Sequence, residues 1–180
     1  MKQVVLLILL SSTLTFGQNN KRDSIWSPIK YFVGTWKGEG GGEPGIGTYE
    51  RSYQLILNNN FVEIKNKSTY APTDKNPKGE VHEDIGYFIY DKGKKTFLLR
   101  QLHLENFAND YVLESISADK KTLVFVTEAI INIPKGWKAK ETYRILSEKE
   151  FEETFELAEP GKEFMVYSKV KFAKQSMFYP

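Results

Sequence analysis

The feature that most constrains the fold is an alternation of apolar and polar residues that runs from about residue 35 to residue 173. Turn-forming residues interrupt it about every ten to twelve positions, and no helical periodicity survives past residue 36. Such short strands, joined by hairpins, leave no room for crossover helices, so we expect one antiparallel sheet that closes into a barrel without edges. The ten predicted strands cover residues 35–41, 47–57, 60–70, 80–90, 95–104, 107–117, 122–132, 137–146, 150–158 and 163–173.

The N-terminal segment is expected to lie outside this barrel. Lys2, the apolar run Val4–Leu10 and small residues near Gly17 are typical of a secretory signal peptide over residues 1–17. The apolar run is too short to span a membrane, and a retained N-terminal anchor is the alternative. We therefore expect cleavage near Gly17 and export to the periplasm or the cell exterior.

The expected mature chain divides into a leader and one domain. Residues 18–27 are polar, which predicts a mobile leader. The domain covers residues 28–180 and opens with Pro28–Val33, an apolar segment suited to a short helical plug at one end of the barrel. The predicted fold class is therefore all-β, a single ten-stranded antiparallel barrel with an N-terminal helical plug.

Composition excludes several function classes. The chain has no cysteine, so disulfides, thiolate metal sites and cysteine nucleophiles are ruled out. Its 25 lysines and arginines nearly balance 23 acidic residues without a basic block, which gives no reason to expect a nucleic-acid partner. An aromatic content of 14% suits a β-rich protein with a lined cavity.

Both histidines of the chain lie in one predicted hairpin, Glu80–Glu105, whose two alternating runs flank a Lys-Gly turn. If Tyr90 pairs with Lys95 across that turn, His82 lies directly opposite His103. Opposed residues on one face have Cβ atoms about 4.5 to 5.5 Å apart, so both imidazoles would reach one ligand, ion or water.

The same pairing sets Asp84 opposite Gln101 on the face of the two histidines. A bulge at Gly93 would instead shift the register by one residue and place the histidines on opposite faces. The prediction that the two histidines share a site therefore depends on the register that this turn sets.

Pairing of apolar residues across the later hairpins predicts which side chains face inward. A short loop at 147–149 and a turn at 158–162 place most large apolar residues on one face, and two carboxylates with them. This face contains Tyr143, Ile145, Phe155, Leu157, Phe164 and Val166, together with Glu141 and Glu153. The corresponding residues are Phe88, Tyr90, Phe97 and Leu99 in the central hairpin, and Tyr49, Arg51, Tyr53 and Leu55 in the second strand. The strand 122–132 is apolar on both faces, so whether Thr127 or Glu128 faces inward stays open.

At Gly34-Thr35-Trp36 the chain resembles the calycins, the group that includes lipocalins and fatty-acid-binding proteins. The motif from His82 to Tyr87 is similar to the His-x-acid-x-Gly-aromatic motif of the nitrobindin-like haem-binding barrels. The resemblance covers about residues 28–173 and implies a haem pocket. In that family a last-strand histidine holds the iron, whereas the matching stretch Lys162–Lys169 contains no histidine.

Several functions remain open from the sequence. We expect the lumen to bind a small, mainly apolar molecule with a polar or anionic group. The ligand-binding candidates are His82, His103, Asp84, Gln101, Arg51, Tyr53, Phe88, Phe97, Tyr143, Glu141, Glu153 and Phe155. His82 and His103 could instead hold zinc or iron with Asp84, or simply form a hydrogen-bonded polar patch. Haem bound through His82 or His103, or through the oxygen of Tyr87, Tyr90 or Tyr111, is a further alternative.

An enzyme is the third alternative. It would use Glu141 and Glu153 as an acid and base pair. Otherwise these carboxylates form a salt-bridged lumen patch with Arg51 or Arg100.

Overall fold

The computed structural model describes residues 23–74 and 76–176, so the predicted signal peptide lies outside the described residues. It contains two units, one that ends at Phe32 and one that begins at Val33, and each is described by itself.

In the first unit, residues 23–30 form a helix that begins within the segment predicted to be a mobile leader. Pro28 has no N–H to donate to the carbonyl of Ser24, and the hydroxyl of Ser27 donates to this oxygen instead, at 2.9 Å. The role of this segment as a plug stays a prediction. Within the described ranges, no helix is long and apolar enough to cross a membrane.

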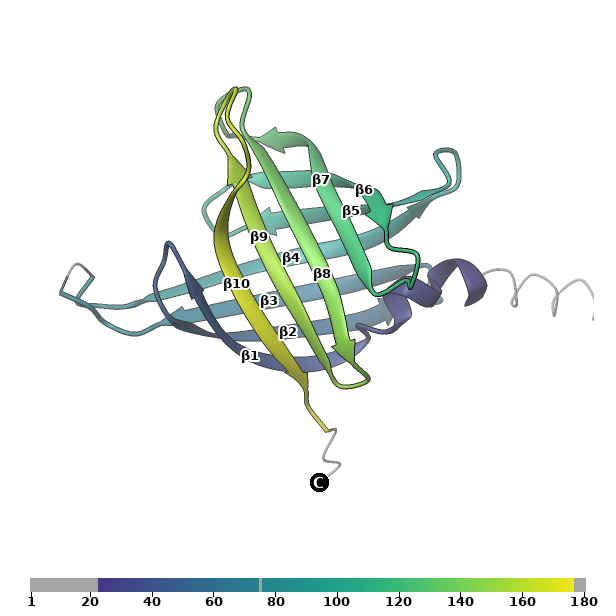
Figure 1. The fold of residues 1–180 in the computed structure, drawn as a ribbon, viewed down its shortest axis with the longest axis horizontal. Helices are drawn as coiled ribbons and strands as arrows, with labels where there is room; N and C mark the ends of the chain where they lie inside the picture. Colours follow the sequence, from purple (N-terminus) through teal and green to yellow (C-terminus); the bar gives the residue numbers. More distant parts are fainter. Residues whose placement is uncertain (1–22, 75, 177–180) are drawn as a thin grey trace, which may run out of the picture. The chain divides into compact units, whose positions relative to one another are not determined.

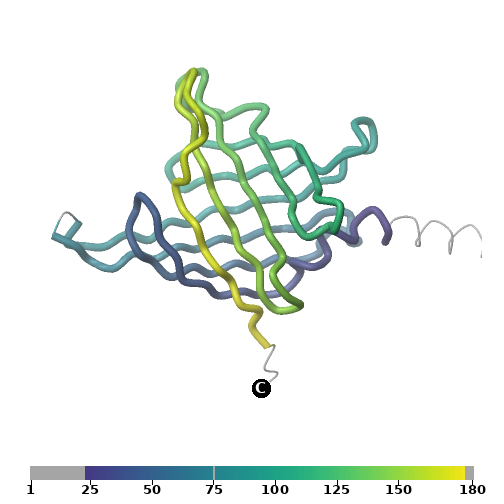
Figure 2. Tube along the Cα trace, in the orientation of Figure 1, coloured from purple at the N-terminus to yellow at the C-terminus, as the bar shows by residue number. Residues whose placement is uncertain are grey.

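The second unit is the predicted ten-stranded barrel. Every strand pairs antiparallel with its neighbours, and the pairing of the first strand with the last closes the sheet (Figure 1). The chain trace shows the hairpins following one another around the barrel (Figure 2). The strands are β1 (Gly34–Gly42), β2 (Gly47–Ile56), β3 (Phe61–Tyr70), β4 (Glu80–Asp91), β5 (Thr96–His103), β6 (Ala108–Ile116), β7 (Thr122–Ile131), β8 (Lys138–Ser147), β9 (Glu150–Ala158) and β10 (Met165–Lys174).

An aromatic core fills the half of the barrel nearest the β2–β3 and β4–β5 turns. The rings of Trp36 and Phe151 meet edge to face with centroids 4.8 Å apart, and Phe88 contacts Phe125 at 5.4 Å. Edge-to-face and offset ring pairs add to the free energy gained by burying apolar area. Other fully buried members of the core are Tyr53, Leu99, Tyr111, Tyr143 and Phe172.

The prediction of the inward face fails at the start of β10. A bulge between Val166 and Ser168 shifts the pairing with β9 and turns Ser168 inward, opposite Phe155. Val166 is 54% exposed, so its predicted place inside the barrel is wrong. A bulge inserts one residue into one strand, which reverses the faces of the residues beyond it.

β1 extends to Gly42, one residue beyond the predicted strand 35–41. A Cβ atom at Gly38, Gly40 or Gly42 would overlap backbone atoms of β10, so these glycines let the two strands approach closely.

The inward residue of β7, which the sequence left open, is Thr127. Glu128 faces solvent, where it pairs with Lys94 at 2.9 Å. Thr127 bonds through its hydroxyl to both backbone groups of Ala139, at 2.9 and 3.3 Å.

Candidate functional site

A cavity of about 550 Å³ lies in the half of the barrel that the aromatic core leaves unfilled. Its lining comes from most strands and from the β1–β2, β5–β6 and β7–β8 connections, to which Pro44, Phe107 and Trp137 belong. Phe155 and Leu157 contribute apolar wall on β9. Side chains therefore fill one half of the barrel interior, and the cavity in the other half has room for one small molecule.

A belt of buried polar side chains forms the base of this cavity, with members from seven different strands. It is continuous across the sheet, because Arg51, Asn66, Asp84 and His103 pair in turn across β2, β3, β4 and β5. Amide and charged side chains are mostly exposed in proteins, and they are buried only with partners. A belt of such side chains inside the barrel therefore indicates a site and not ordinary core packing. Its buried members are Arg51, Asn66, Asp84, Gln101, Asn109, Glu141 and Glu153.

Arg51 forms a two-point ion pair with Glu153. Its Nη2 and Nε donate to the carboxylate oxygens at 2.7 and 3.3 Å, and the guanidinium lies 5.1 Å from the ring centre of Phe172. Burial would lower the pKa of the Arg51 guanidinium, but the charge and hydrogen bonds of Glu153 outweigh it and raise that pKa. Glu153 is thus the inward carboxylate that Arg51 compensates. The alternative partner, Arg100, pairs with Asp110 and is exposed.

Glu141 lies in the same belt as Glu153 but in a different electrostatic environment. Its Oε2 atom is buried and has no hydrogen-bond partner in the described part of the chain. Burial, reinforced by the negative charge of Glu153, raises the pKa of the Glu141 carboxyl well above its usual range. This raised pKa favours the neutral carboxyl form of Glu141, which can donate a hydrogen bond into the cavity, and the two glutamates therefore have opposite electrostatic environments.

The two histidines share a face, but the predicted register between their strands is wrong by two residues. Tyr90 pairs with Phe97 rather than with Lys95, so His103 lies opposite Asp84 and not opposite His82. The turn has four residues, as predicted, but it lies one position later, at residues 92–95 instead of 91–94. The carboxylate of Asp91 accepts the N–H of Gly93 at 2.7 Å and that of Lys94 at 3.0 Å, and Lys95 adopts a left-handed φ of 54°.

A shift of two residues keeps every side chain on its predicted face. The imidazoles of His82 and His103 are diagonal neighbours, with ring centres 5.7 Å apart. The Nδ1 atom of His82 lies 2.6 Å from a carboxylate oxygen of Glu105 at the cavity mouth.

Their surroundings shift the pKa values of the two imidazoles in opposite directions. Asp84, whose Oδ2 atom lies 3.7 Å from Nε2 of His82, raises the pKa of His82 against the effect of burial, and Glu105 adds to the increase. Burial lowers the pKa of His103, whose ring stacks on Phe107 at 4.0 Å. Burial would raise the pKa of Asp84, but the neighbouring imidazole of His82, the charge of Arg51 and other neighbours lower it overall.

The cavity brings together eight of the twelve residues predicted to bind ligand. These are His82, His103, Asp84, Gln101, Arg51, Glu141, Glu153 and Phe155. Tyr53, Phe88, Phe97 and Tyr143 are not among its lining residues, and all four are buried instead in the core. The alternation shows that these aromatic residues face inward, but it contains no information on depth along the barrel.

Sequence reasoning missed two members of the belt, Asn66 and Asn109. The Nδ2 atom of Asn66 donates to Asp84 at 2.6 Å, and that of Asn109 donates to the hydroxyl of Tyr111 at 2.9 Å. A signal for Asn66 was present, since it stands between two outward lysines in a predicted strand. Asn109 carries no comparable signal, because it lies just after a loop.

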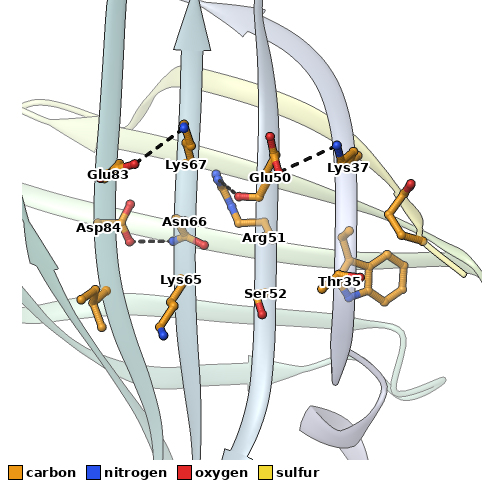
Figure 3. Close-up of a pocket in the computed structure, with 13 residues that line it drawn as sticks. Thr35, Lys37, Glu50, Arg51, Ser52, Lys65, Asn66, Lys67, Glu83 and Asp84 are labelled. Atoms are coloured by element: carbon orange, nitrogen blue, oxygen red, sulfur yellow. Dashed lines mark hydrogen bonds and ion pairs between the residues drawn. The ribbon is translucent and has the colours of Figure 1, made fainter. Parts of the chain in front are cut away.

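A second hollow, of about 590 Å³, lies across β1 to β4 (Figure 3). Lys37, Glu50, Lys67 and Glu83 pair in turn across these strands, and the outer two pairs have N–O distances of 3.9 Å. Charges that alternate in this way compensate one another and are solvated. The hollow therefore shows no preference for a ligand, in contrast with the internal cavity.

Comparisons with known proteins bear on the fold. No family profile matches the chain, and no curated protein matches it. Among solved structures, Rv2717c from M. tuberculosis is similar with a TM-score of 0.65 and 16% identity, covering 84% of this chain and 98% of that protein. An S-type phycobiliprotein lyase, CPES, from Guillardia theta has a TM-score of 0.52 and 9% identity, over 83% and 91% of the two chains. At these identities the likeness is one of fold, and it confirms the predicted all-β barrel.

Proposed function

We propose that the barrel binds one small molecule with an apolar body and a polar end. The observation that carries this proposal is a set of buried polar atoms at the cavity base that have no hydrogen-bond partner in the described ranges. Each such atom costs about 1–3 kcal/mol if it stays unpaired, so a ligand or ordered water has to satisfy it. They include Gln101 Oε1, Asn109 Oδ1 and Glu141 Oε2.

The charges of the cavity favour a neutral or hydrogen-bond-donating polar end. Arg51 is already compensated by Glu153, and the carboxylates of Asp84 and Glu105 add further negative charge. An anionic group, which the sequence also allowed, would have to displace Glu153 from Arg51 and leave a buried carboxylate unpaired.

Native mass spectrometry of gently purified protein tests this proposal. We expect a bound molecule that denaturation releases, and lower occupancy in Gln101→Leu, which removes one hydrogen-bonding group from the base. Leu102→Gln, at the next and outward-facing position, is the matched control and keeps full occupancy. Protein that carries no molecule and admits no neutral dye such as Nile red would overturn the proposal.

Haem binding of the nitrobindin-like kind is the second candidate. The feature in its favour is His103, whose Nδ1 atom is buried without a hydrogen-bond partner among the described residues. A neutral imidazole in a cavity wall is the usual axial ligand of haem iron. Titration with haemin should then give a Soret band that His103→Ala abolishes and Gln101→Leu retains. If no band appears with the native protein, this candidate is rejected.

We further propose that the chain is exported and that its mature form begins near Gln18. The charged and apolar pattern of residues 1–17 supports this proposal. N-terminal sequencing of the protein from its native cells, after separation of the cytoplasm, should identify Gln18 or a close neighbour as the first residue. An intact Met1 in the cytoplasmic fraction would contradict export.

A further inference from the structure

Three possible metal ligands converge at one side of the cavity. His82 and Asp84 lie two residues apart on the inner face of β4, and His103 on β5 pairs directly with Asp84. One donor atom from each residue lies within 4.8 Å of the others. The Nε2 atom of His82 and the Oδ2 atom of Asp84 are already 3.7 Å apart.

Each of these residues is held in place through its other polar atom. The Nδ1 atom of His82 meets Glu105 at 2.6 Å, and the Oδ1 atom of Asp84 accepts from Asn66 at 2.6 Å. This leaves Nε2 of His82 and Oδ2 of Asp84 to face one another. Outer carboxylates and amides that orient metal ligands in this way are a regular feature of protein metal sites.

His103 repeats the pattern. Its Nε2 atom lies 3.3 Å from the side-chain amide of Asn109, and its Nδ1 atom is buried with no hydrogen-bond partner in the described part of the chain. A buried ring nitrogen without a partner is costly unless a ligand, water or ion occupies the space beside it. This atom is therefore a second, independent indication of a bound group.

We propose that His82, Asp84 and His103 bind a divalent transition-metal ion of the zinc class, with a fourth position open to the cavity. Two imidazoles and one carboxylate are a common ligand set for zinc and for non-haem iron. Ligands at about 2.0–2.2 Å from a tetrahedral ion are about 3.3–3.6 Å from each other, so the 3.7 Å separation of His82 and Asp84 needs little change. His82, with 26% of its side chain exposed, has room for the remaining movement.

The charge around the three ligands suits a cation. Glu80 and Glu105 lie beside them at the cavity mouth and, with Asp84, bring three carboxylates to this side of the cavity. Glu80, His82 and Glu105 also form an alternative donor set of more exposed residues. The two sets share His82. Asp84 and His103 belong only to the first set, and Glu80 and Glu105 only to the second, so substitutions distinguish the two sets.

Calorimetric titration of zinc into chelator-treated full-length protein tests the site, with Co²⁺ absorption as a report on tetrahedral geometry. Asp84→Asn and His103→Gln should each weaken zinc binding by more than the roughly 10- to 100-fold expected when an outer residue such as Glu105 is changed to Gln. Glu83→Gln, on the outer face of β4, is the matched control and should bind as the native protein does. Glu80→Gln removes only one neighbouring charge and should weaken zinc binding by much less than Asp84→Asn or His103→Gln does.

Normal binding by Asp84→Asn together with a loss in Glu80→Gln would assign the metal to the exposed set and overturn the proposal. No zinc or cobalt binding by the native protein would also overturn it. Circular dichroism establishes that each variant is folded; if His103→Gln is not, Asp84→Asn and the native cobalt spectrum decide. The titration uses the metal alone, so its failure leaves the small-molecule proposal standing, and the reverse also holds.

Discussion

The guanidinium of Arg51 and the carboxylate of Glu153 form a two-point ion pair inside the barrel, with nitrogen–oxygen distances of 2.7 and 3.3 Å. Only 7% and 9% of the two side chains is exposed, so each charge depends on the other for compensation. The pair joins β2 to β9, which are not neighbours in the sheet. It therefore links two strands that β1 and β10 separate, at the base of the cavity.

Removal of one partner should cost more than removal of both. Glu153→Gln leaves a buried guanidinium without a counter-charge, and we expect a loss of about 3–5 kcal/mol in the free energy of unfolding. The double variant Arg51→Met, Glu153→Leu replaces the pair with apolar groups and should recover much of that loss. Urea unfolding of the two variants and the native protein gives the comparison. A double variant that is the less stable of the two would contradict this account.

A large side chain placed in the cavity should block ligand entry without unfolding the barrel. Ser168 lines the cavity opposite Phe155, so Ser168→Trp would project an indole into the open space. We expect Nile red to bind about tenfold more weakly or worse, since steric overlap costs about 1–3 kcal/mol. Lys169→Trp, the exposed neighbour, is the control for the added indole and should leave dye fluorescence unchanged. Equal dye binding by both variants would mean that the dye does not occupy this cavity.

The strands were predictable from the sequence because alternation and turn residues are local signals. Tyr49, Arg51 and Tyr53 alternate with polar residues in β2, and all three are buried as this pattern requires. Asn58 and Asn59 mark the following turn, where both adopt left-handed φ angles of 57° and 58°. The side chains of a strand that face the interior could therefore be predicted without knowledge of the rest of the chain.

Register and depth were less predictable because they depend on contacts remote in sequence. The position of the β4–β5 turn depends on how the side chain of Asp91 bonds to the backbone, and the bulge before Ser168 depends on how β10 meets β9. Alternation also cannot separate Tyr53, which lies in the solid core, from Arg51, which faces the cavity. The polar site could be predicted as a face of the sheet but not as a place in the barrel.

The closure of the barrel should depend on Gly42. A Cβ atom at this position would overlap the carbonyl oxygen of Tyr167 and lie 2.8 Å from Cα of Ser168, and both are backbone atoms that cannot rotate away. Gly42→Ala should therefore destabilise the protein by about 1–3 kcal/mol through overpacking. Gly41→Ala is the matched control, because its nearest atom lies 3.3 Å away. Urea unfolding that shows equal stability for the two variants would rule out this close approach of β1 and β10.

The raised pKa of the Glu141 carboxyl should make stability fall as pH rises. Burial, then the charge of Glu153, raises its pKa in the folded state above the ordinary 4.5, so the folded chain holds a proton that the unfolded chain releases. Stability from this group is complete below about pH 4.5 and declines by about 1.4 kcal/mol per pH unit until the folded-state pKa is reached.

Glu141→Gln keeps a neutral group of similar shape but removes the titration. We expect its stability advantage over the native protein to be small near pH 4 and to grow as the pH rises toward neutrality. Glu148→Gln, in the exposed β8–β9 turn, is the control and should follow the native curve. The measurement is urea unfolding at a series of pH values. Parallel curves for the native protein and Glu141→Gln would show that Glu141 is ionised in the fold, and hence that it cannot donate a hydrogen bond to a ligand.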